Sequence, residues 1–158
     1  MIWPINAQQL DSLLALSSKR NSRMIENKRM DIFDAPANSM LVHACNCMGV
    51  WGSGIARLFK EKFPKTHEHY KNFCQSRSDL LGTATFWDEG KYAVGCLFTS
   101  YSFGEDKDDE AKILEATKTA LVDLFELAKI FNRTEIYSNK FNSGLFGVPW
   151  HKTESILV

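Results

Sequence analysis

Two glycine-rich segments of this chain contain residue types that hold phosphate groups in proteins. The first, residues 46–54, lies between an apolar run at 41–45 and a helical pattern beginning at Ile55. Its glycines are Gly49, Gly52 and Gly54. Glycine lets bare backbone approach a ligand, and the N–H groups at a helix start attract anions. This spacing predicts a phosphate-binding loop with the amide of Asn46 at its edge.

The second segment, residues 142–150, joins a predicted strand to a predicted helix and contains Gly144 and Gly147. Either loop alone also fits a tight connection that binds nothing. Two such loops at carboxyl ends of strands favour a bipartite phosphate site, which would suit a diphosphate-bearing nucleotide. We expect Phe146 either to stack on a sugar or base or to pack in the core, and Trp150 to pack in the core.

Asp31 follows the first predicted strand, residues 24–30. A carboxylate at a strand end can accept a hydrogen bond from the exocyclic amine of a nucleotide base. The alternative is a solvent-exposed aspartate in a turn, which is the interpretation we keep for Asp34.

His43 lies inside the apolar run, and period-two alternation places His43, Cys45 and Cys47 on one face of the predicted strand. The same alternation places Asn46 with Ala44 on the opposite face. An H-x-C-x-C triplet can bind a metal ion, but no fourth ligand stands at a recognisable spacing. A buried, hydrogen-bonded histidine fits better. No carboxylate cluster marks a magnesium or manganese site, so we expect no metal site and a metal-independent reaction.

The four cysteines do not form a phosphatase nucleophile. A C-x5-R loop requires arginine six residues after the cysteine, but Trp51 follows Cys45 and Ser53 follows Cys47 at that distance. The chain contains no C-x-x-C pair. We therefore interpret the cysteines as reduced, mostly buried thiols of a cytoplasmic protein.

Length and charge limit the classes of function. A chain of 158 residues fits one domain with a sizeable core. The 19 basic and 19 acidic side chains give a formal net charge of zero, which disfavours long duplex nucleic acid as a partner. No apolar run is long enough to span a bilayer, and the first residues lack the pattern of a signal peptide. We expect a monomer that binds a small molecule and no membrane.

The hydrophobic pattern predicts alternating strands and helices. Helices are expected over residues 5–20, 55–62, 65–75, 108–131 and 151–158. Strands are expected over residues 24–30, 40–45, 83–87, 92–99 and 134–138, with a hairpin turn at 88–90. This order indicates an α/β layered domain with a largely parallel or mixed sheet, in which ligands bind at the carboxyl ends of strands.

Four separated pieces of the sequence, in this order, resemble a macrodomain. They are Met30-Asp31-Ile32, the strand ending in Asn46, Gly52-Ser53-Gly54-Ile55-Ala56, and Ser143-Gly144-Leu145-Phe146-Gly147. The resemblance covers residue 24 to the end of the chain. Within the family, segments 43–47, 96–100 and 142–150 look most like the ADP-ribose-1''-phosphate phosphatase branch.

The resemblance implies a three-layer αβα macrodomain with a mixed, largely parallel central sheet and no cofactor. It implies hydrolysis of ADP-ribose-1''-phosphate to ADP-ribose and phosphate. Two alternatives stay open: a non-catalytic ADP-ribose-binding module, and a hydrolase that removes ADP-ribose from protein or nucleic acid. The implied ligand-binding residues are Asp31, Ile32, Asn46, Gly52, Ser53, Gly54, Ile55, Ser143, Gly144, Leu145 and Phe146.

Each part of the ligand has an implied contact. Asp31 would bind the adenine amino group, with the Ile32 backbone beside it, and the two glycine loops would enclose the diphosphate and the distal ribose. Asn46 would orient the distal ribose or a water molecule, and Thr99 and Ser100 would line the pocket floor. His43 is the nearest candidate acid or base because imidazole titrates near neutral pH.

The sequence also departs from related macrodomains. The ADP-ribosyl-glutamate hydrolase branch uses a lysine in the loop after the predicted 92–99 strand and an aspartate in the second glycine loop. Here those places read Tyr101-Ser102-Phe103-Gly104 and Leu145-Phe146-Gly147, so a covalent lysine mechanism is not expected. We expect residues 1–158 to form a single macrodomain, with 1–23 as an N-terminal helical extension. The 24–158 core would lack the last strand usual in the family.

Overall fold

A computed structural model describes residues 2–6, 25–133 and 135–157 of the chain. Within these residues one sheet has the strand order β1-β5-β2-β4-β3. The strands are β1 (Ile2–Asn6), β2 (Met40–Asn46), β3 (Ala84–Asp88), β4 (Ala93–Ser100) and β5 (Glu135–Asn139). The central strands β5, β2 and β4 are parallel, and the edge strands β1 and β3 pair in the antiparallel sense. The predicted mixed sheet is confirmed, with parallel pairing confined to its centre.

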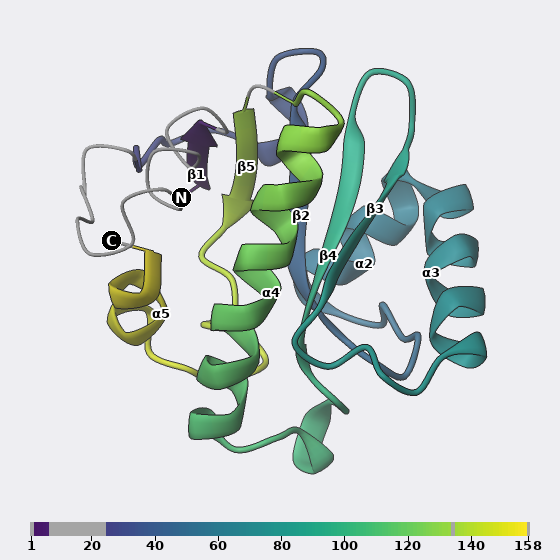
Figure 1. Cartoon of the computed structure of the whole chain (residues 1–158), viewed down its shortest axis with the longest axis vertical. Coiled ribbons are helices and arrows are strands. Elements are labelled where there is room, and N and C mark those ends of the chain that lie inside the picture. Colours follow the sequence, from purple (N-terminus) through teal and green to yellow (C-terminus); the bar gives the residue numbers. More distant parts are fainter. Residues whose placement is uncertain (1, 7–24, 134, 158) are drawn as a thin grey trace.

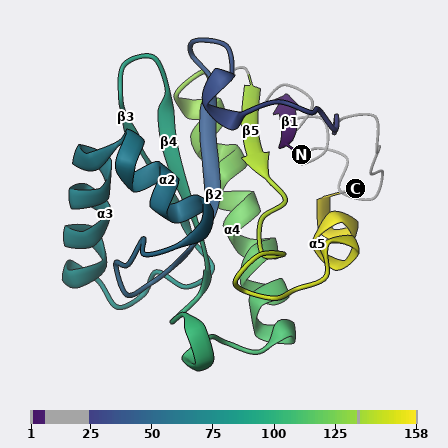
Figure 2. The same ribbon diagram turned by 180° about the vertical axis from the view of Figure 1, so that it is seen from behind.

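Helices cover both faces of the sheet, as Figures 1 and 2 show. The helices are α2 (Gly54–Lys62), α3 (Pro64–Ser76), α4 (Glu110–Ile130) and α5 (Trp150–Leu157), with short 3₁₀ helices η2 (Ile32–Asp34) and η3 (Gly104–Asp106). Helices α2 and α3 pack on one face, and α4 and α5 pack on the other. The predicted three-layer αβα architecture is confirmed.

Successive side chains of β2 pack into two separate hydrophobic cores. Leu41 and Cys45 belong to the core beneath α2 and α3, whereas Met40 and Val42 belong to the core beneath α4. Successive side chains of a strand point to opposite faces, so a continuous apolar run is what a strand covered on both faces requires. The same alternation directs His43 toward α2.

Most predicted elements lie within two residues of the observed ones. Pro64 begins α3, where a missing N–H is tolerated in the first turn. Asp109 caps α4 by accepting a hydrogen bond from the backbone N–H of Lys112 at 2.9 Å. The hairpin between β3 and β4 turns at Gly90, whose φ is +83°.

Two predicted elements differ from the structure: the strand at 24–30 and the start of the helix at 5–20. The described part of the predicted 24–30 strand, residues 25–30, does not form a strand: Ile25 and Lys28 are isolated bridge positions, and all six residues are exposed or half-buried. Ile5, predicted to begin a helix, lies in β1 opposite Ile136, because the free edge of β5 offers backbone hydrogen bonds. Asn6 also lies in β1, and residues 7–20 of that predicted helix lie outside the described residues.

Candidate functional site

The loop after β2 is organised by the side chain of Asn46. Its Nδ2 donates to the backbone oxygen of Val50 at 2.8 Å. Its Oδ1 accepts from the backbone N–H groups of Met48 at 3.0 Å and Val50 at 3.3 Å. Gly49 completes the turn with a φ of +79°, and a side-chain carbon there would lie 3.3 Å from the α3 backbone. Asn46 therefore fixes the shape of the first loop.

Strict alternation predicted that Asn46 points to the same face of the sheet as Ala44. In the structure, Asn46 instead contacts Tyr70 on α3. The hydroxyl of Tyr70, on α3, donates to the backbone oxygen of Asn46 at 2.7 Å and lies 3.0 Å from its Oδ1. The register of β2 against β4 shifts between Cys45 and Asn46, which turns the end of the strand. Burial raises the pKa of Tyr70, so its hydroxyl stays protonated and remains a donor.

The start of α2 presents backbone donors beside the second loop. Ser53 is the N-cap residue, but its side chain makes no capping hydrogen bond. Gly54 follows with a φ of +61°, and a Cβ placed on it would lie 3.6 Å from Cδ1 of Leu145. The first N–H groups of a helix have no partner within the helix, and the dipole there is positive. The structure thus brings the two predicted glycine loops into contact across an anion-attracting helix end.

The second loop is anchored by a buried chain of hydrogen bonds. Thr99, at the end of β4, donates to Oδ1 of Asn142 at 2.8 Å, and Nδ2 of Asn142 donates to Oγ1 of Thr117, on α4, at 2.9 Å. Thr117 in turn donates to the backbone oxygen of Ile113 at 2.7 Å. Asn142 has a φ of +68°, and its backbone oxygen accepts from Val148 at 2.9 Å. Thr99 therefore holds the loop instead of lining an open floor.

The tip of the second loop is open to solvent. Gly144 and Leu145 are exposed, Leu145 at 66%, and Ser143 and Phe146 are half-buried. Trp150 packs edge-to-face on Phe141 with ring centroids 5.9 Å apart, which confirms its predicted role in the core.

Several large apolar side chains are exposed around the two loops. They are Met48 and Val50 in the first loop, Tyr101 and Phe103 after β4, and Leu145 in the second loop. Such side chains are costly in water unless a ligand covers them. We call residues 46–54 and 142–150 together the two-loop site.

Ser100 and Tyr101 tie the neighbouring connection together. Oγ of Ser100 donates to the backbone oxygen of Ser102 at 2.8 Å and accepts from the backbone N–H of Asp108 at 3.0 Å. The backbone N–H of Cys47 donates to the backbone oxygen of Tyr101 at 2.9 Å. Ser100 is buried and positions this connection rather than a ligand.

The adenine-binding residues expected from the resemblance lie beside α2. Asp31 is exposed, and one of its carboxylate oxygens accepts from the backbone N–H of Phe33 at 3.0 Å. Ile32 is buried in the core beneath α2 and α3. Phe33 contacts Phe59, and their ring centroids are 5.2 Å apart. Phe59 lies five residues after Gly54, which is about 8 Å along α2. No described contact joins Asp31 to the two-loop site itself.

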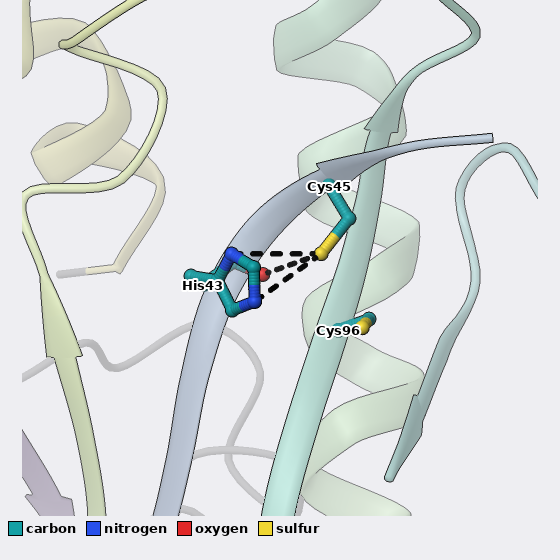
Figure 3. A group of neighbouring side chains, drawn as sticks. All are labelled: His43, Cys45 and Cys96. Atoms are coloured by element: carbon teal, nitrogen blue, oxygen red, sulfur yellow. Dashed lines mark hydrogen bonds between the residues drawn. The ribbon is translucent and has the colours of Figure 1, made fainter. Parts of the chain in front are cut away.

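His43 lies in the core beneath the first loop. Its ring has no exposed surface, stacks on Phe59 at 4.2 Å and meets Trp51 edge-on at 4.8 Å. Figure 3 shows His43 and Cys45 on β2 beside Cys96 on β4. The structure therefore gathers His43 with Cys45 and Cys96, whereas the sequence pattern grouped His43 with Cys45 and Cys47.

The environments of the four thiols differ. All four cysteines are free and buried, as predicted. Burial raises the pKa of Cys45, but a hydrogen bond with Cys96 and the electrostatic influence of His43 outweigh it and lower the pKa to about 6. Burial, together with the hydrogen bond to Cys45, raises the pKa of Cys96 well above its ordinary value.

Cys47 and Cys74 lie together at a small pocket of about 200 Å³, which is also lined by Met48 and Tyr101. Burial raises the pKa of Cys47 to about 12 and that of Cys74 to about 11. Thiols with these pKa values are poor nucleophiles at neutral pH. The pocket therefore offers no reactive thiolate beside the first loop.

Sequence reasoning missed three residues that the structure places at these loops. Tyr70 lies on the buried face of α3 with Thr66 and Cys74, so its i, i+4 spacing marked it as buried but gave no sign of its partner. Asn142 is asparagine at a positive φ, a conformation that this residue type tolerates.

The third missed residue is Lys107. Its Cε lies 3.9 Å from the position that a Cβ on Gly147 would occupy. Among the side chains that the structure describes, Lys107 forms no ion pair. It stands three residues beyond the tetrapeptide that sequence analysis considered.

None of the described helices is both long and apolar enough to cross a membrane.

A protein from Candida albicans, named ADP-ribose 1''-phosphate phosphatase, is 38% identical over 85% of this chain and 92% of its own length. A protein of the same name from Chaetomium globosum is 36% identical over 84% of this chain and 82% of its own.

Solved structures agree with the fold. The macrodomain of Mycobacterium tuberculosis DarG superposes with a TM-score of 0.69 at 22% identity, covering 82% of this chain and 84% of that one. Thermosipho africanus DarTG in complex with ADP-ribose also gives 0.69, at 16% identity over 80% of this chain and 35% of that one. At these identities the likeness shows the fold alone. A sequence model of the Macro domain matches residues 42–157, and the chain belongs to the macro domain family.

Proposed function

We propose that this protein binds ADP-ribose and hydrolyses ADP-ribose-1''-phosphate to ADP-ribose and phosphate. The observation that carries the proposal is the approach of Gly54, at the start of α2, to Leu145 of the second loop. A strand-end loop, an uncapped helix start and a second glycine loop form a site suited to phosphate groups. The shared name of the two fungal relatives supports the specific substrate.

The ligand would extend along α2. Its diphosphate would accept hydrogen bonds from the backbone N–H groups at Ser53, Gly54 and Ile55, with Gly52 allowing close approach. Its adenine would reach Asp31 and the backbone of Ile32 beside the second half of the helix. The exposed tip of the second loop would cover the diphosphate and distal ribose from the other side, through Ser143, Gly144, Leu145 and Phe146.

The reaction adds water across the bond between phosphorus and the ribose oxygen. Water supplies the hydroxyl that phosphorus gains and the proton that the ribose oxygen gains. Charge stabilisation by preorganised donors is the main requirement of such a transfer. Lys107 offers a cation beside the second loop, with its Cε 3.9 Å from the position of a Cβ on Gly147.

Asn46 and His43 take different parts in this proposal. Asn46 holds the Met48–Val50 turn in shape, and its amide would also orient the distal ribose. Because His43 is enclosed between Phe59 and Trp51, we assign it to packing and to the cluster described below rather than to proton transfer.

Two measurements test the proposal. Isothermal titration should show stoichiometric binding of ADP-ribose, and absence of binding would overturn the whole assignment. Phosphate release from ADP-ribose-1''-phosphate should follow, with ADP-ribose as the other product. Because no carboxylate cluster marks the site, the rate should not change when Mg²⁺ and Mn²⁺ are withheld.

A second function, a binding module without turnover, is favoured by the absence of a placed acid or base. The candidate acid–base residue His43 is fully buried, and the amide of Asn46 is engaged by its own loop. A protein that binds ADP-ribose but releases no phosphate would establish this second function instead. In either case we place the protein in the cytoplasm, where four free thiols stay reduced.

A further inference from the structure

One cluster of metal-ligating side chains lies outside the two-loop site. His43 and Cys45 come from β2 and Cys96 from β4, where Cys96 pairs in register with His43. Their ligand atoms all lie within 4.8 Å of one another, and all three residues are buried (Figure 3). Two thiols and an imidazole are the donor set that thiophilic metal ions prefer.

The spacing of the donors fits a single ion. Sγ of Cys45 lies 3.7 Å from both ring nitrogens of His43. Zinc–sulfur bonds of about 2.3 Å and zinc–nitrogen bonds of about 2.0–2.1 Å, arranged tetrahedrally, separate neighbouring donors by roughly 3.6–3.8 Å. Binding one ion would require the most distant donors to close by about 1 Å and the His43 ring to turn one nitrogen toward the ion.

A second observation points to the same place. Trp51 is 1% exposed, and its indole Nε1 is buried without a hydrogen-bond partner. The indole ring lies edge-on against the His43 ring, with ring centroids 4.8 Å apart. Unsatisfied buried donors are rare in folded proteins, and donors around metal sites commonly orient or stabilise the ligands. A sulfur ligand carrying full negative charge would give this N–H the acceptor it lacks.

We propose that His43, Cys45 and Cys96 bind one thiophilic d¹⁰ metal ion, Zn²⁺ or Cu⁺, inside the core beneath the first loop. Two thiolates neutralise Zn²⁺, which suits burial in an apolar layer, and a water molecule would complete its fourth position. Cu⁺ is stable with three ligands and needs no fourth.

The site goes beyond the proposed function because none of its residues reaches the ligand. The ion would join β2 to β4 directly below the strand end that carries Asn46. Since the three residues are at most 2% exposed, the metal enters as the chain folds, and its binding energy adds to the stability of the fold.

The test is refolding of the full chain under reducing conditions with Zn²⁺, and separately with Cu⁺ under anaerobic conditions, followed by removal of loose metal and elemental analysis. We expect about one ion per chain, and a shift of the denaturation midpoint to higher denaturant when the metal is present. Whichever of the two refolding experiments, with Zn²⁺ or with Cu⁺, gives about one ion per chain identifies the bound ion. Less than about a tenth of an ion per chain in both arms overturns the proposal.

Variants locate the site. Cys45→Ser and Cys96→Ser should each lose nearly all bound metal, and Trp51→Phe should weaken metal binding by about 10–100-fold. Cys47→Ser and Cys74→Ser, at the separate pocket, should retain it. Equal loss in both pairs of cysteine variants would contradict this location.

If a variant at Cys45 or Cys96 fails to fold, wild-type protein refolded with Cd²⁺ decides instead. Ultraviolet thiolate-to-cadmium absorption equivalent to two sulfur ligands supports the site. Its absence overturns the site. The same measurement on the Cys47→Ser, Cys74→Ser double variant should give the same two-sulfur signal.

Discussion

The amide of Asn46 satisfies three groups of its own loop and meets a tyrosine hydroxyl from a neighbouring helix. An amide supplies both donors and an acceptor, which neither aspartate nor leucine of similar size can do. The residue is therefore suited to hold a turn in shape while standing at the edge of a binding site.

Replacing Asn46 by alanine should lower phosphate release by at least about 100-fold, because the loop donors lose their preorganised positions. The free energy of unfolding should fall by about 1–3 kcal/mol, since backbone groups of the turn lose partners. Phosphate-release kinetics and urea denaturation measure the two effects. Unchanged turnover would remove Asn46 from the site.

Tyr70→Phe is the matched control for Asn46→Ala. It keeps the buried ring and removes only the hydroxyl that donates to Asn46. Because the hydrogen bonds within the loop stay, turnover should fall less than in Asn46→Ala. An equal loss would show that Tyr70, rather than the loop bonds, sets the position of Asn46.

Lys107→Gln should raise KM for ADP-ribose-1''-phosphate by about fivefold, close to 1 kcal/mol, because one exposed cation beside the second loop is lost. The effect should shrink at high salt, where screening weakens the wild-type contact. Lys118→Gln, on the outer surface of α4 beside Glu115, should leave KM unchanged. The same rise in KM in both variants would indicate a general charge effect.

The residue types predicted where the two glycine loops lie, but they did not predict which side chains contact one another there. Glycine spacing located both loops, since phosphate binding and tight turns use the same residue. The direction of Asn46 could not be predicted, because a register shift between Cys45 and Asn46 interrupts the alternation. Cys96 could not be grouped with His43 and Cys45, because their proximity depends on which strand pairs with β2.

At the scale of elements, the junction between β2 and α2 requires a left-handed backbone at Gly54, close to Leu145. Gly54→Ala should destabilise the fold by about 1–2 kcal/mol through backbone strain. It should also weaken ADP-ribose binding by at least about tenfold, because the added methyl group lies between the two loops. Titration calorimetry and thermal unfolding measure these changes.

Gly90→Ala is the matched control, since Gly90 also has a positive φ but no atom within 4 Å of an added Cβ. It should be destabilised by a similar amount and bind ADP-ribose as the wild type does. Weakened binding in the control would mean that strain anywhere in the fold, rather than crowding at the loops, reduces affinity.

The second loop depends on the Thr99–Asn142–Thr117 chain of hydrogen bonds. Asn142→Ala should reduce the free energy of unfolding by at least about 2 kcal/mol, since two buried hydroxyls lose a partner and alanine is strained at positive φ. Asn142→Gly should lose less of the free energy of unfolding. It loses the same hydrogen bonds, but glycine adopts a positive φ without strain. Identical stability in wild type and both variants would show that the chain contributes nothing.

Helices and strands with a clear period could be predicted, because the pattern that marks them is the pattern that buries them. Helix α4 and the β3–β4 hairpin are examples. Strand β1 could not be predicted, since five residues carry too short a pattern and their partner β5 lies near the other end of the chain. In the predicted 24–30 strand, the charged and polar residues Glu26–Arg29 interrupt the apolar pattern, and the described residues 25–30 are all half-buried or exposed.

At the scale of the whole molecule, we predict a monomer. Away from the two-loop site, the large exposed apolar side chains among the described residues are Leu58, Val122, Ile130 and Phe131. Four such side chains provide far less apolar area than a stable dimer interface buries. Light scattering should give a mass near 18.0 kDa at all practical concentrations. A mass of twice that value would contradict this prediction.

The pairing of β1 with β5 affects how the protein forms during synthesis. Residues 2–6 are synthesised before their partners at 135–139, which follow roughly 6–26 s later at about 5–20 residues per second. Throughout that interval the first strand has no partner in the sheet. We expect this segment to stay available to chaperones until β5 has been made, and the sheet edge to close only after that point.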